Sequence, residues 1–365
     1  MKIVVQLPEH AAAVRAFNER LAAKGATYSF PLLPPTVQAD GSLGSTNYLA
    51  MDGDEVRGGY TLIRHESLVT EVLQPVQFLQ IPLSEGIVDP KFRMVGALLL
   101  KDALKKSPLL FGLGMGGIEQ PLPRLLKALG FKLHSVPFYF RVFRPARFFR
   151  SIVPLRSTPL RRTAFDFLAA THILDLPVLM VHAAKAAGAP GRGGVETAIV
   201  NEFEGWADTV WEAARHRYSM VAERYAAALN LRYPQSAERL IRLRIRRRGA
   251  DIGWAVVMDS QFQDHKYFGR MRVGTFVDAL ALPGEEALVV REAVAFLRGR
   301  SADLMISNQC AEVWGSALQN NGFLAAASNF GFAASPKLFA LLAETDPSFA
   351  RAHLCRGDGD GPIHL

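Results

Sequence analysis

The order of hydrophobic and polar positions predicts a series of helices and strands in the first part of the chain. Residues 10–24 carry apolar side chains at the spacing of an amphipathic helix, which Gly25 ends. Residues 47–63 form two strand-like runs around Asp52-Gly53-Asp54, which predicts a β-hairpin. The following elements are then expected in order: a strand at 77–88, a helix at 95–104, a strand at 109–113, a helix at 121–129 and one or two closing strands at 133–143.

The second part of the chain repeats this order. It predicts a helix at 202–218, a hairpin at 239–258, a strand at 273–282, a helix at 286–297, a strand at 303–307, a helix at 312–319 and closing strands at 324–333. The two parts also share a motif. Residues 125–131 end in Gly-Phe and precede Phe138-Tyr139-Phe140, while residues 317–323 end in Gly-Phe and precede Phe330-Gly331-Phe332. An echo over such a distance indicates two copies of one supersecondary unit.

Length agrees with this duplication, because 365 residues suit two domains of ordinary size. We expect domains at residues 1–144 and 197–365, joined by a connection at 145–196 that ends in a glycine-rich hinge at 191–194. The apolar helical face of this connection is expected to pack between the domains, with an amphipathic helix on a membrane surface as the alternative. The glycine-rich and aspartate-rich tail, 356–361, is expected to be a loop.

Positive charge is concentrated in two places. The net charge is +8, and there are seven arginines and no acid at 141–164 and six arginines among the ten residues 239–248. These clusters are typical of a solvated basic surface or of attraction to an anionic partner such as a phosphorylated cofactor, a nucleotide-linked substrate, a membrane surface or RNA.

Other compositional features narrow the class of protein. Two cysteines, Cys310 and Cys355, do not make a disulfide framework or a zinc site, and they fit a reducing cytoplasm. No N-terminal signal is visible, and ionisable residues interrupt the longest apolar region, 165–188, so no membrane-spanning helix is expected. The histidines are scattered, and no metal site is predicted.

The turn at residues 89–98 is the best candidate for an anion site. It joins a predicted strand to a predicted helix, where free backbone N–H groups and the positive end of the helix dipole suit a pyrophosphate. Gly96 would allow a close approach of the backbone, and Lys91 and Arg93 add positive charge.

The order helix, hairpin, strand, glycine-bearing turn, helix, strand, helix and closing strands resembles the GNAT-type acyl-CoA N-acyltransferases. Their phosphate turn reads Arg/Gln-x-x-Gly-x-Gly/Ala; here Arg93 and Gly96 match, and Leu98 replaces the usual small residue. The resemblance covers almost the whole chain. It implies an α/β (α+β) fold of two consecutive GNAT-like domains, each a mixed twisted sheet flanked by helices. It also implies acetyl-CoA, or another acyl-CoA, as cofactor, bound by Ile87, Val88, Lys91, Arg93, Met94, Val95, Gly96 and Ala97.

The resemblance also implies how the reaction would proceed. In this family the strand before the turn splays from its neighbour and the pantetheine arm pairs with strand backbone, so an N–H group near residues 86–88 would bind the thioester oxygen. Glu85 is then the candidate general base for the amine, with Asp89 as a weaker candidate. Leu126 stands where the family often has a tyrosine general acid. We expect His65, Gly114 and Met115 to bind the acceptor substrate.

Aligning the two copies indicates that only the first binds the cofactor. Arg93 falls opposite Glu286 and Gly96 opposite Val289, so the second copy offers a pyrophosphate the acidic pair Glu285-Glu286. The predicted function is transfer of an acyl group, most often acetyl, to an amine of a small molecule or amino sugar. Two alternatives remain: an aminoacyl-tRNA-dependent transferase of the peptidoglycan-peptide type, whose RNA the arginine clusters would suit, and a non-catalytic acyl-CoA-binding protein.

Overall fold

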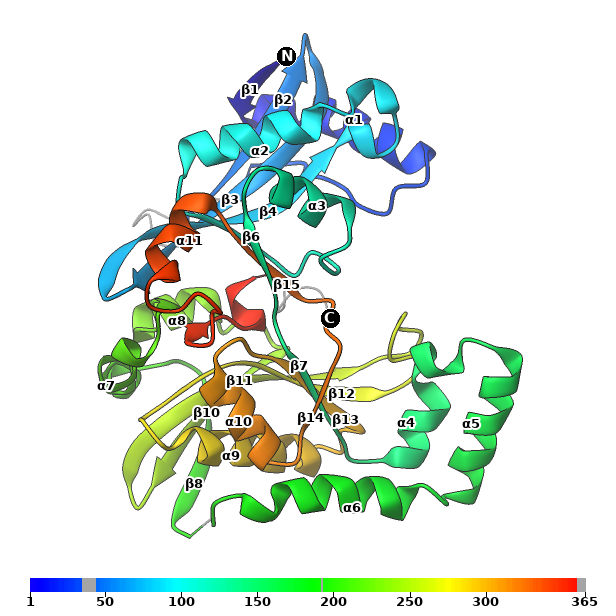
Figure 1. The fold of residues 1–365 in the computed structure, drawn as a ribbon, viewed down its shortest axis with the longest axis vertical. Coiled ribbons are helices and arrows are strands. Elements are labelled where there is room, and N and C mark those ends of the chain that lie inside the picture. The colour runs from blue at the N-terminus through cyan, green and yellow to red at the C-terminus, as the bar shows by residue number, and fades with distance from the viewer. Residues whose placement is uncertain (35–43, 192, 360–365) are drawn as a thin grey trace. The chain divides into compact units, whose positions relative to one another are not determined.

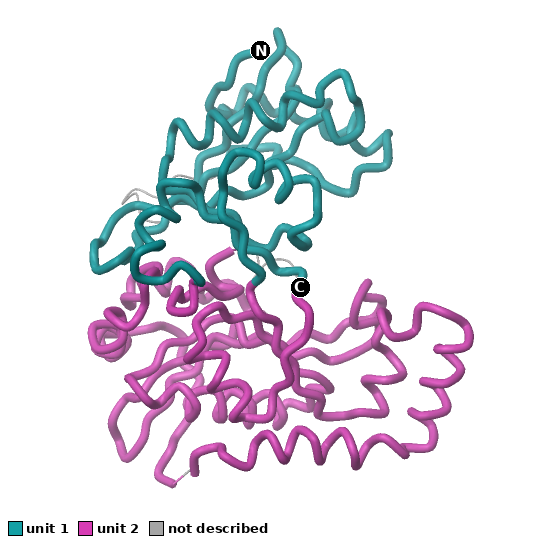
Figure 2. Tube along the Cα trace, viewed as in Figure 1, with its two compact units in different colours: residues 1–135, 329–348 teal, residues 136–328, 349–365 magenta. Residues whose placement is uncertain are grey.

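The computed structural model describes residues 1–34, 44–191 and 193–359, so Arg192 of the predicted hinge and residues 360–365 of the tail lie outside the described residues. The chain forms two compact units (Figures 1 and 2). Unit 1 combines Met1–Ser135 with Asn329–Ser348, and unit 2 combines Val136–Ser328 with Phe349–Leu365. Each unit contains a mixed sheet flanked by helices, which confirms the predicted fold class.

Unit 1 is built on a sheet with the strand order β1-β2-β3-β4-β5-β15-β6. Its elements, with η marking 3-10 helices, are β1 (Lys2–Val5), η1 (Pro8–His10), α1 (Ala11–Ala23), β2 (Ser45–Asp52), β3 (Glu55–Val69), β4 (Val72–Ser84), η2 (Glu85–Ile87), η3 (Pro90–Phe92), α2 (Val95–Lys106), β5 (Leu110–Leu113), α3 (Pro121–Ala128), β6 (Lys132–Ser135), β15 (Gly331–Ala334) and α11 (Pro336–Ala343).

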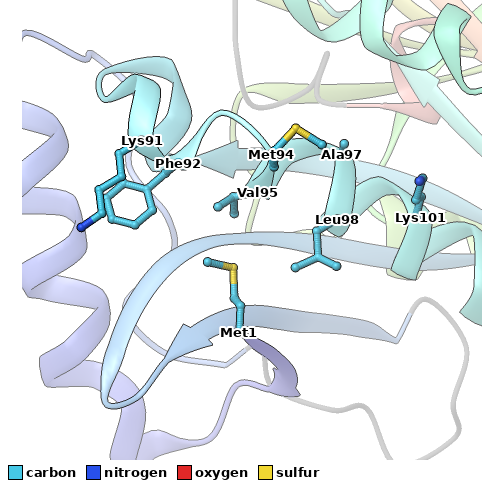
Figure 3. Close-up of a pocket in the computed structure, with 8 residues that line it drawn as sticks. All are labelled: Met1, Lys91, Phe92, Met94, Val95, Ala97, Leu98 and Lys101. Carbon is cyan, nitrogen blue, oxygen red and sulfur yellow. The ribbon is translucent and has the colours of Figure 1, made fainter.

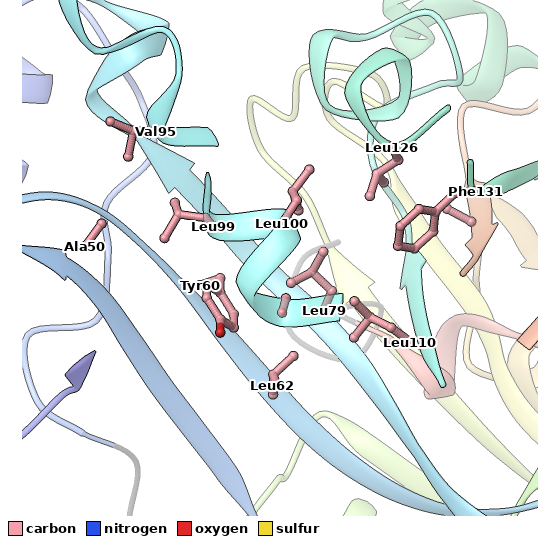
Figure 4. Packing of buried hydrophobic residues seen from close by; sticks show 12 residues of the cluster. Ala50, Tyr60, Leu62, Leu79, Val95, Leu99, Leu100, Leu110, Leu126 and Phe131 are labelled. Carbon is pink, nitrogen blue, oxygen red and sulfur yellow. The ribbon is translucent and has the colours of Figure 1, made fainter. Parts of the chain in front are cut away.

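Two hydrophobic clusters cover the two faces of this sheet. Leu49 of β2 packs with Val14, Phe17 and Leu21 of α1, whereas the next residue, Ala50, packs with α2 and α3. Neighbouring residues of a strand point to opposite faces, so α1 covers one face and α2 and α3 the other. In Figure 4, Val95, Leu99 and Leu100 of α2 lie beside Tyr60, Leu62 and Leu79 of the sheet.

The predicted strand at 77–88 is displaced in the structure. Strand β4 begins at Val72 and ends at Ser84, and residues 85–87 form η2 instead. A tight turn through Thr70 and Glu71, both with positive φ, joins β4 directly to β3. Nothing in the apolar pattern signalled this turn, because it contains neither glycine nor proline.

Unit 2 has the strand order β14-β7-β13-β12-β11-β10-β8. Its elements are β7 (Phe138–Val142), α4 (Pro145–Ser151), η4 (Val153–Arg156), α5 (Pro159–Thr171), α6 (Asp175–Lys185), η5 (Ala186–Gly188), β8 (Val195–Val200), α7 (Gly205–Ala214), η6 (Arg215–Arg217), β9 (Met220–Ala222), α8 (Ala226–Arg232), β10 (Leu240–Arg247), β11 (Ala250–Gln261), β12 (Arg272–Ala281), α9 (Glu286–Gly299), β13 (Leu304–Asn308), α10 (Glu312–Asn320), β14 (Leu324–Ala326), β16 (Ala352–His353) and η7 (Arg356–Asp358).

The closing strands of the two units are exchanged, and the expected boundary at residue 144 is therefore wrong. Strand β7, which carries Phe138-Tyr139-Phe140, pairs with β13 and β14 in unit 2. Strand β15, next to Phe330, pairs with β5 and β6 in unit 1. Each copy thus keeps its first closing strand and gives its second to the other unit. Such an exchange of equivalent strands resembles domain swapping within one chain.

The region expected to be an interdomain connection, 145–196, belongs to unit 2. Its helices α4, α5 and α6, which we call the helical excursion together with the residues between them (144–188), leave the sheet after β7 and return to it at β8 (Figure 1). Among the described residues no single helix has the length and apolar composition of a membrane span. Helices α5 and α6 pass that test only as a pair bent by 81°.

Candidate functional site

In unit 1, strands β4 and β5 separate partway along their length. Within the described residues they pair only at Gln77 with Leu110 and at Phe78 with Phe111. Beyond Phe78, β4 continues to Ser84 against β3 alone, and β5 continues to Leu113 against β15 alone. A bulge opposite Tyr60 accompanies the separation, with Ile81 at a φ of 46°. The facing strand edges thus have backbone groups that no ladder satisfies, which suits the amides of an extended ligand.

The turn after β4 brings the chain back to the start of α2 through two short 3-10 helices. The Ser84 hydroxyl accepts a hydrogen bond from the Gly86 N–H, and the Asp89 carboxylate accepts one from the Lys91 N–H. Gly86 lies so close to the second turn that a Cβ there would be 2.6 Å from the Phe92 carbonyl oxygen. No other residue fits at this position, so Gly86 fixes the turn beneath the helix.

The first turn of α2 presents unpaired donors to solvent. In the part of the chain that the structure describes, the N–H groups of Met94, Val95, Gly96 and Ala97 donate to no protein acceptor, as expected for a helix start without a cap. The side chains of Lys91 and Arg93 are exposed, and within the described part of the chain no carboxylate forms an ion pair with either of them. The predicted residues are therefore assembled into one positively charged helix N-terminus, which favours an anion.

A cavity of about 370 Å³ flanks this helix start. Met1 faces Val95 and Leu98 across it, and Lys91 and Lys101 lie at its ends (Figure 3). The lining is apolar apart from these two ammonium groups. It can therefore hold a flat or aliphatic group whose phosphates remain at the helix start.

Two predicted donors beside the turn are already occupied. The Gly86 N–H bonds Ser84, and the Val88 N–H bonds the Glu85 carbonyl. The thioester oxygen was expected to bind near residues 86–88, and these two groups are not free to receive it. Ile87 is exposed beside the turn, while Val88 packs against the α1 cluster. The edge of β4 that β5 leaves unpaired lies upstream, at residues 79–84, and no sequence feature predicted the bulge there.

Glu85 is held by two arginines and not by the sheet. Its oxygens accept hydrogen bonds from Arg20 Nε at 3.0 Å and Arg57 Nη1 at 3.0 Å, and the carboxylate is buried. Burial alone would raise the pKa of this carboxyl, but the two guanidinium groups outweigh it and hold the pKa below its ordinary value. Its role as a general base stays a prediction, and a lowered pKa weakens a base.

Residues expected to contact the acceptor lie in the sheet and its core. The ring of His65 is buried, with its centroid 5.8 Å from that of Phe111. The Gly114 N–H bonds the Gly331 carbonyl of the exchanged strand, and Met115 packs against the α2 cluster. Leu126, at the position where the resemblance places a tyrosine, is fully buried in that cluster (Figure 4).

The equivalent helix start in unit 2 carries a buried carboxylate. Glu286, at the start of α9, accepts a hydrogen bond from the Gly284 N–H at 3.1 Å and forms an ion pair with Arg217. This carboxylate is buried where an incoming phosphate would need to sit. The alignment of the two copies predicted the acidic pair Glu285-Glu286 at this helix start, and the structure shows that Glu286 bonds Gly284 and Arg217.

The gap beyond the last β12–β13 pair in unit 2 is filled by the C-terminal segment. Strands β12 and β13 pair from Val273 to Phe276. Beyond that point the His353 ring donates to the Ala279 carbonyl, and the Cys310 N–H donates to the Leu354 carbonyl. In unit 2 the C-terminal segment thus occupies the position that corresponds to the gap between the unpaired parts of β4 and β5 in unit 1. The loop expected at residues 356–361 is consequently buried at Gly357 and Asp358.

A fully buried guanidinium holds this segment. Arg224 bonds Asp278 Oδ1 at 3.2 Å and Asp358 Oδ1 at 2.9 Å, and the Tyr233 hydroxyl donates to the other oxygen of Asp278. Asp278, His353 and Cys355 have donor atoms within 4.8 Å of one another, the spacing of a metal site. Because the Arg224 cation already neutralises the carboxylates, the cluster has the charge pairing of a structural network.

This cluster makes unit 2 sensitive to acid. Burial and the nearby Arg224 lower the pKa of His353 to about 4, from an ordinary value near 6.5. The folded state therefore disfavours protonation of His353. The free energy of unfolding is unaffected above about pH 6.5 and falls as the pH drops toward 4, by about 3 kcal/mol in all. All four tryptophans lie at 206–314, so urea unfolding followed by tryptophan fluorescence at pH 7 and pH 5 measures this unit. His353→Gln should lose less stability between the two pH values than the wild type or His172→Gln; equal losses would contradict the assignment.

The second arginine cluster is paired within the protein. Arg244 bonds Asp251, Arg246 bonds Glu196 and Arg247 bonds Glu285. Arg242 is buried and donates to the Tyr233 carbonyl. Three of the six arginines in this cluster are thus neutralised by carboxylates, which makes the strand a weaker phosphate-binding surface than its composition suggests.

The fold is found among solved N-acyltransferase structures. No protein-family model and no curated protein matches the chain. A conserved protein of unknown function from Enterococcus faecalis V583, described as a probable N-acyltransferase, has a TM-score of 0.51 at 8% identity over 93% of this chain and 74% of its own. Saccharomyces cerevisiae N-myristoyltransferase with bound myristoyl-CoA has a TM-score of 0.49 at 8% identity over 92% and 78%. A GCN5-related N-acetyltransferase from Anabaena variabilis has 0.46 at 9% over 91% and 72%. At 8% identity, the similarity to the Enterococcus faecalis protein shows a shared fold alone.

Proposed function

We propose that the protein is an acyl-CoA-dependent N-acyltransferase whose donor binds in unit 1. The observation that carries this proposal is the juxtaposition of two features in one unit: a helix start with four free N–H groups and a strand pair that separates beside it. The diphosphate would accept from residues 94–97, with Lys91 and Arg93 adding charge. The pantetheine amides would pair with the free edges of β4 and β5.

In the proposed reaction, an amine attacks the thioester carbonyl carbon. The N–C bond forms, negative charge builds on the carbonyl oxygen, and the C–S bond then breaks to release the coenzyme A thiolate. The amine proton passes to a base and the thiolate takes up a proton. With Leu126 buried and no tyrosine between Tyr60 and Tyr139, we propose that solvent supplies the latter proton. Acetyl is the proposed acyl group, and a small amine or amino sugar the acceptor.

We further propose that unit 2 has lost donor binding. Two independent contacts support this: the Glu286 carboxylate at the start of α9 and the C-terminal segment beside β12. The two units share the order of helix, hairpin, strand, helix, strand and helix, so unit 2 supplies the frame of a second domain without its ligand.

A non-catalytic acyl-CoA-binding protein is the second candidate, favoured by the two arginines on Glu85 and by the buried Leu126. Under both hypotheses acetyl-CoA should stabilise the folded protein and so raise its melting temperature. At a concentration a hundred times Kd, the stabilisation is about 2.7 kcal/mol. Release of free thiol from acetyl-CoA in the presence of an amine panel separates them. Thiol release supports the transferase, whereas binding without release supports the second candidate, and no binding contradicts both.

Glu85→Gln tests whether the carboxylate anchors the turn or removes the amine proton. As an anchor, its loss leaves Arg20 and Arg57 without their shared partner and lowers the free energy of unfolding of unit 1 by about 3 kcal/mol. We expect that result in urea unfolding followed by circular dichroism, with Glu66→Gln, in an exposed pair with Arg64, as the matched control. A variant of unchanged stability whose turnover falls and whose pH profile shifts would instead establish Glu85 as the base.

A further inference from the structure

The helical excursion presents many large apolar side chains to solvent. Nine of the 24 exposed large hydrophobic side chains among the described residues lie between residues 153 and 181. On α6, Leu176 is 68% exposed and Met180 60% exposed, and both lie on one helix face with Leu179 and Ala183. On α5, Leu160 is 81% exposed and Phe167 64% exposed. Such a concentration exceeds the scattered apolar residues of an ordinary surface.

The opposite face of the excursion is anchored, so the outward face is fixed. Val178 of α6 and Phe148 of α4 pack against the cluster formed around β7. The His182 ring accepts a hydrogen bond from the Val142 N–H at 3.2 Å and donates one to the Gly322 carbonyl at 2.7 Å. Helix α6 is thereby bound to its own unit along one stripe and exposed along the other. Figure 1 shows α5 and α6 at the border of unit 2.

The excursion is also strongly basic. Residues 144–188 contain seven arginines and lysines and two aspartates. The aspartates are already paired, Asp166 with Arg156 and Asp175 with His172. Among the described residues no carboxylate forms an ion pair with Arg161, Arg162 or Lys185, and all three are exposed. Cations thus flank the apolar side chains without internal compensation.

We propose that the outer face of α5 and α6 is a docking surface for an anionic phospholipid bilayer. Apolar side chains flanked by arginine and lysine are the combination that places a helix in the headgroup region, where the apolar stripe enters the acyl boundary and the cations meet lipid phosphates. The excess positive charge makes a second copy of this face a poor partner, because two such surfaces repel. This inference goes beyond the proposed transferase and does not depend on it.

Vesicle flotation tests the proposal with the full chain. Vesicles of phosphatidylcholine with phosphatidylglycerol should carry the protein upward at low salt and release much of it at high salt, whereas phosphatidylcholine alone should carry little. The double variants Leu176→Ser/Met180→Ser and Arg161→Glu/Arg162→Glu should each lower the bound fraction at least about tenfold, since each removes one of the two interactions. These side chains are exposed, so tryptophan fluorescence should show an unchanged fold.

The controls are matched substitutions outside the excursion. Leu33→Ser removes an apolar side chain that is 62% exposed in unit 1, and Arg248→Glu reverses an exposed charge at the β10–β11 turn. Both should bind vesicles as the wild type does. The proposal is overturned if anionic vesicles carry no protein, or if neither double variant binds less than the controls. It is also overturned if the wild type self-associates without lipid and Leu176→Ser/Met180→Ser makes it monomeric, because a second copy then covers the face.

Discussion

Replacing Arg224 by leucine is expected to destabilise unit 2 by about 3–5 kcal/mol. The guanidinium is completely buried and bonds Asp278, Asp358 and the Ala222 carbonyl, the last at 2.7 Å. Without it, Asp278 becomes a buried carboxylate whose remaining side-chain partners are a hydroxyl and a thiol. Asp358 loses one of its two guanidinium partners and keeps the ion pair with Arg232 and the hydrogen bond from the Cys355 N–H. The loss should appear as a lower urea midpoint in tryptophan fluorescence.

Two further variants identify the cause of this loss. Arg246→Leu removes an arginine of the same unit whose ion pair with Glu196 is largely exposed, and it should cost less than about 1 kcal/mol. Adding Asp278→Asn to Arg224→Leu removes the uncompensated charge and should restore part of the stability. If Arg224→Leu and Arg246→Leu shift the midpoint equally, the network does not hold the C-terminal segment in the way inferred here.

Replacing Gly96 by glutamate is expected to weaken acetyl-CoA binding at least about a hundredfold, because a carboxylate near 4 Å from a phosphate costs about 3–4 kcal/mol at an effective dielectric constant of 20. The substitution places a carboxylate in the first turn of α2, and Glu286 places one in the first turn of α9 in unit 2. An acid in the first turn stabilises a helix, so the loss of binding should come without a loss of fold. Isothermal titration calorimetry measures it.

Two matched variants separate the effect of side-chain size at position 96 from the effect of side-chain charge. A Cβ at Gly96 would contact Leu125 at 3.5 Å and the Ser84 hydroxyl at 3.8 Å, both ordinary distances, so Gly96→Ala should fold and bind. Gly96→Gln has the length of glutamate without its charge, and we expect intermediate binding. Equal affinities for the glutamate and glutamine variants would mean that the diphosphate does not approach this helix start.

Sequence patterns predicted the elements well where the signal is local. Helix α1 buries Val14, Phe17 and Leu21 as the spacing predicted, and the first hairpin turns at Gly53, whose φ is 61°. The turn at residues 89–98, which we propose as the anion site, was also expected from the sequence to join a strand to a helix, and the structure places it between β4 and α2. Each of these features depends on a few neighbouring residues.

Features that depend on distant partners were missed. The exchange of β7 and β15 was not predicted, because the strands with which each of them pairs lie far away in the sequence. Glu85 was interpreted from its position beside the turn, whereas its environment is set by Arg20 and Arg57, 65 and 28 residues away. The tail has the composition of a loop, and Asp358 is buried because its long-range partners Arg224 and Arg232 pair with it. The sequence pattern drew attention to Gly96 as the glycine that the turn requires. The structure shows that Gly86 is the more strictly required of the two, because a Cβ there would clash with the Phe92 carbonyl.

A crystal structure of the protein with coenzyme A would test the central claim most directly. We expect the diphosphate within hydrogen-bond distance of the N–H groups of residues 94–97 and the pantetheine arm along the unpaired edges of β4 and β5. Coenzyme A bound at the start of α9 in unit 2, or bound away from both helix starts, would contradict the account.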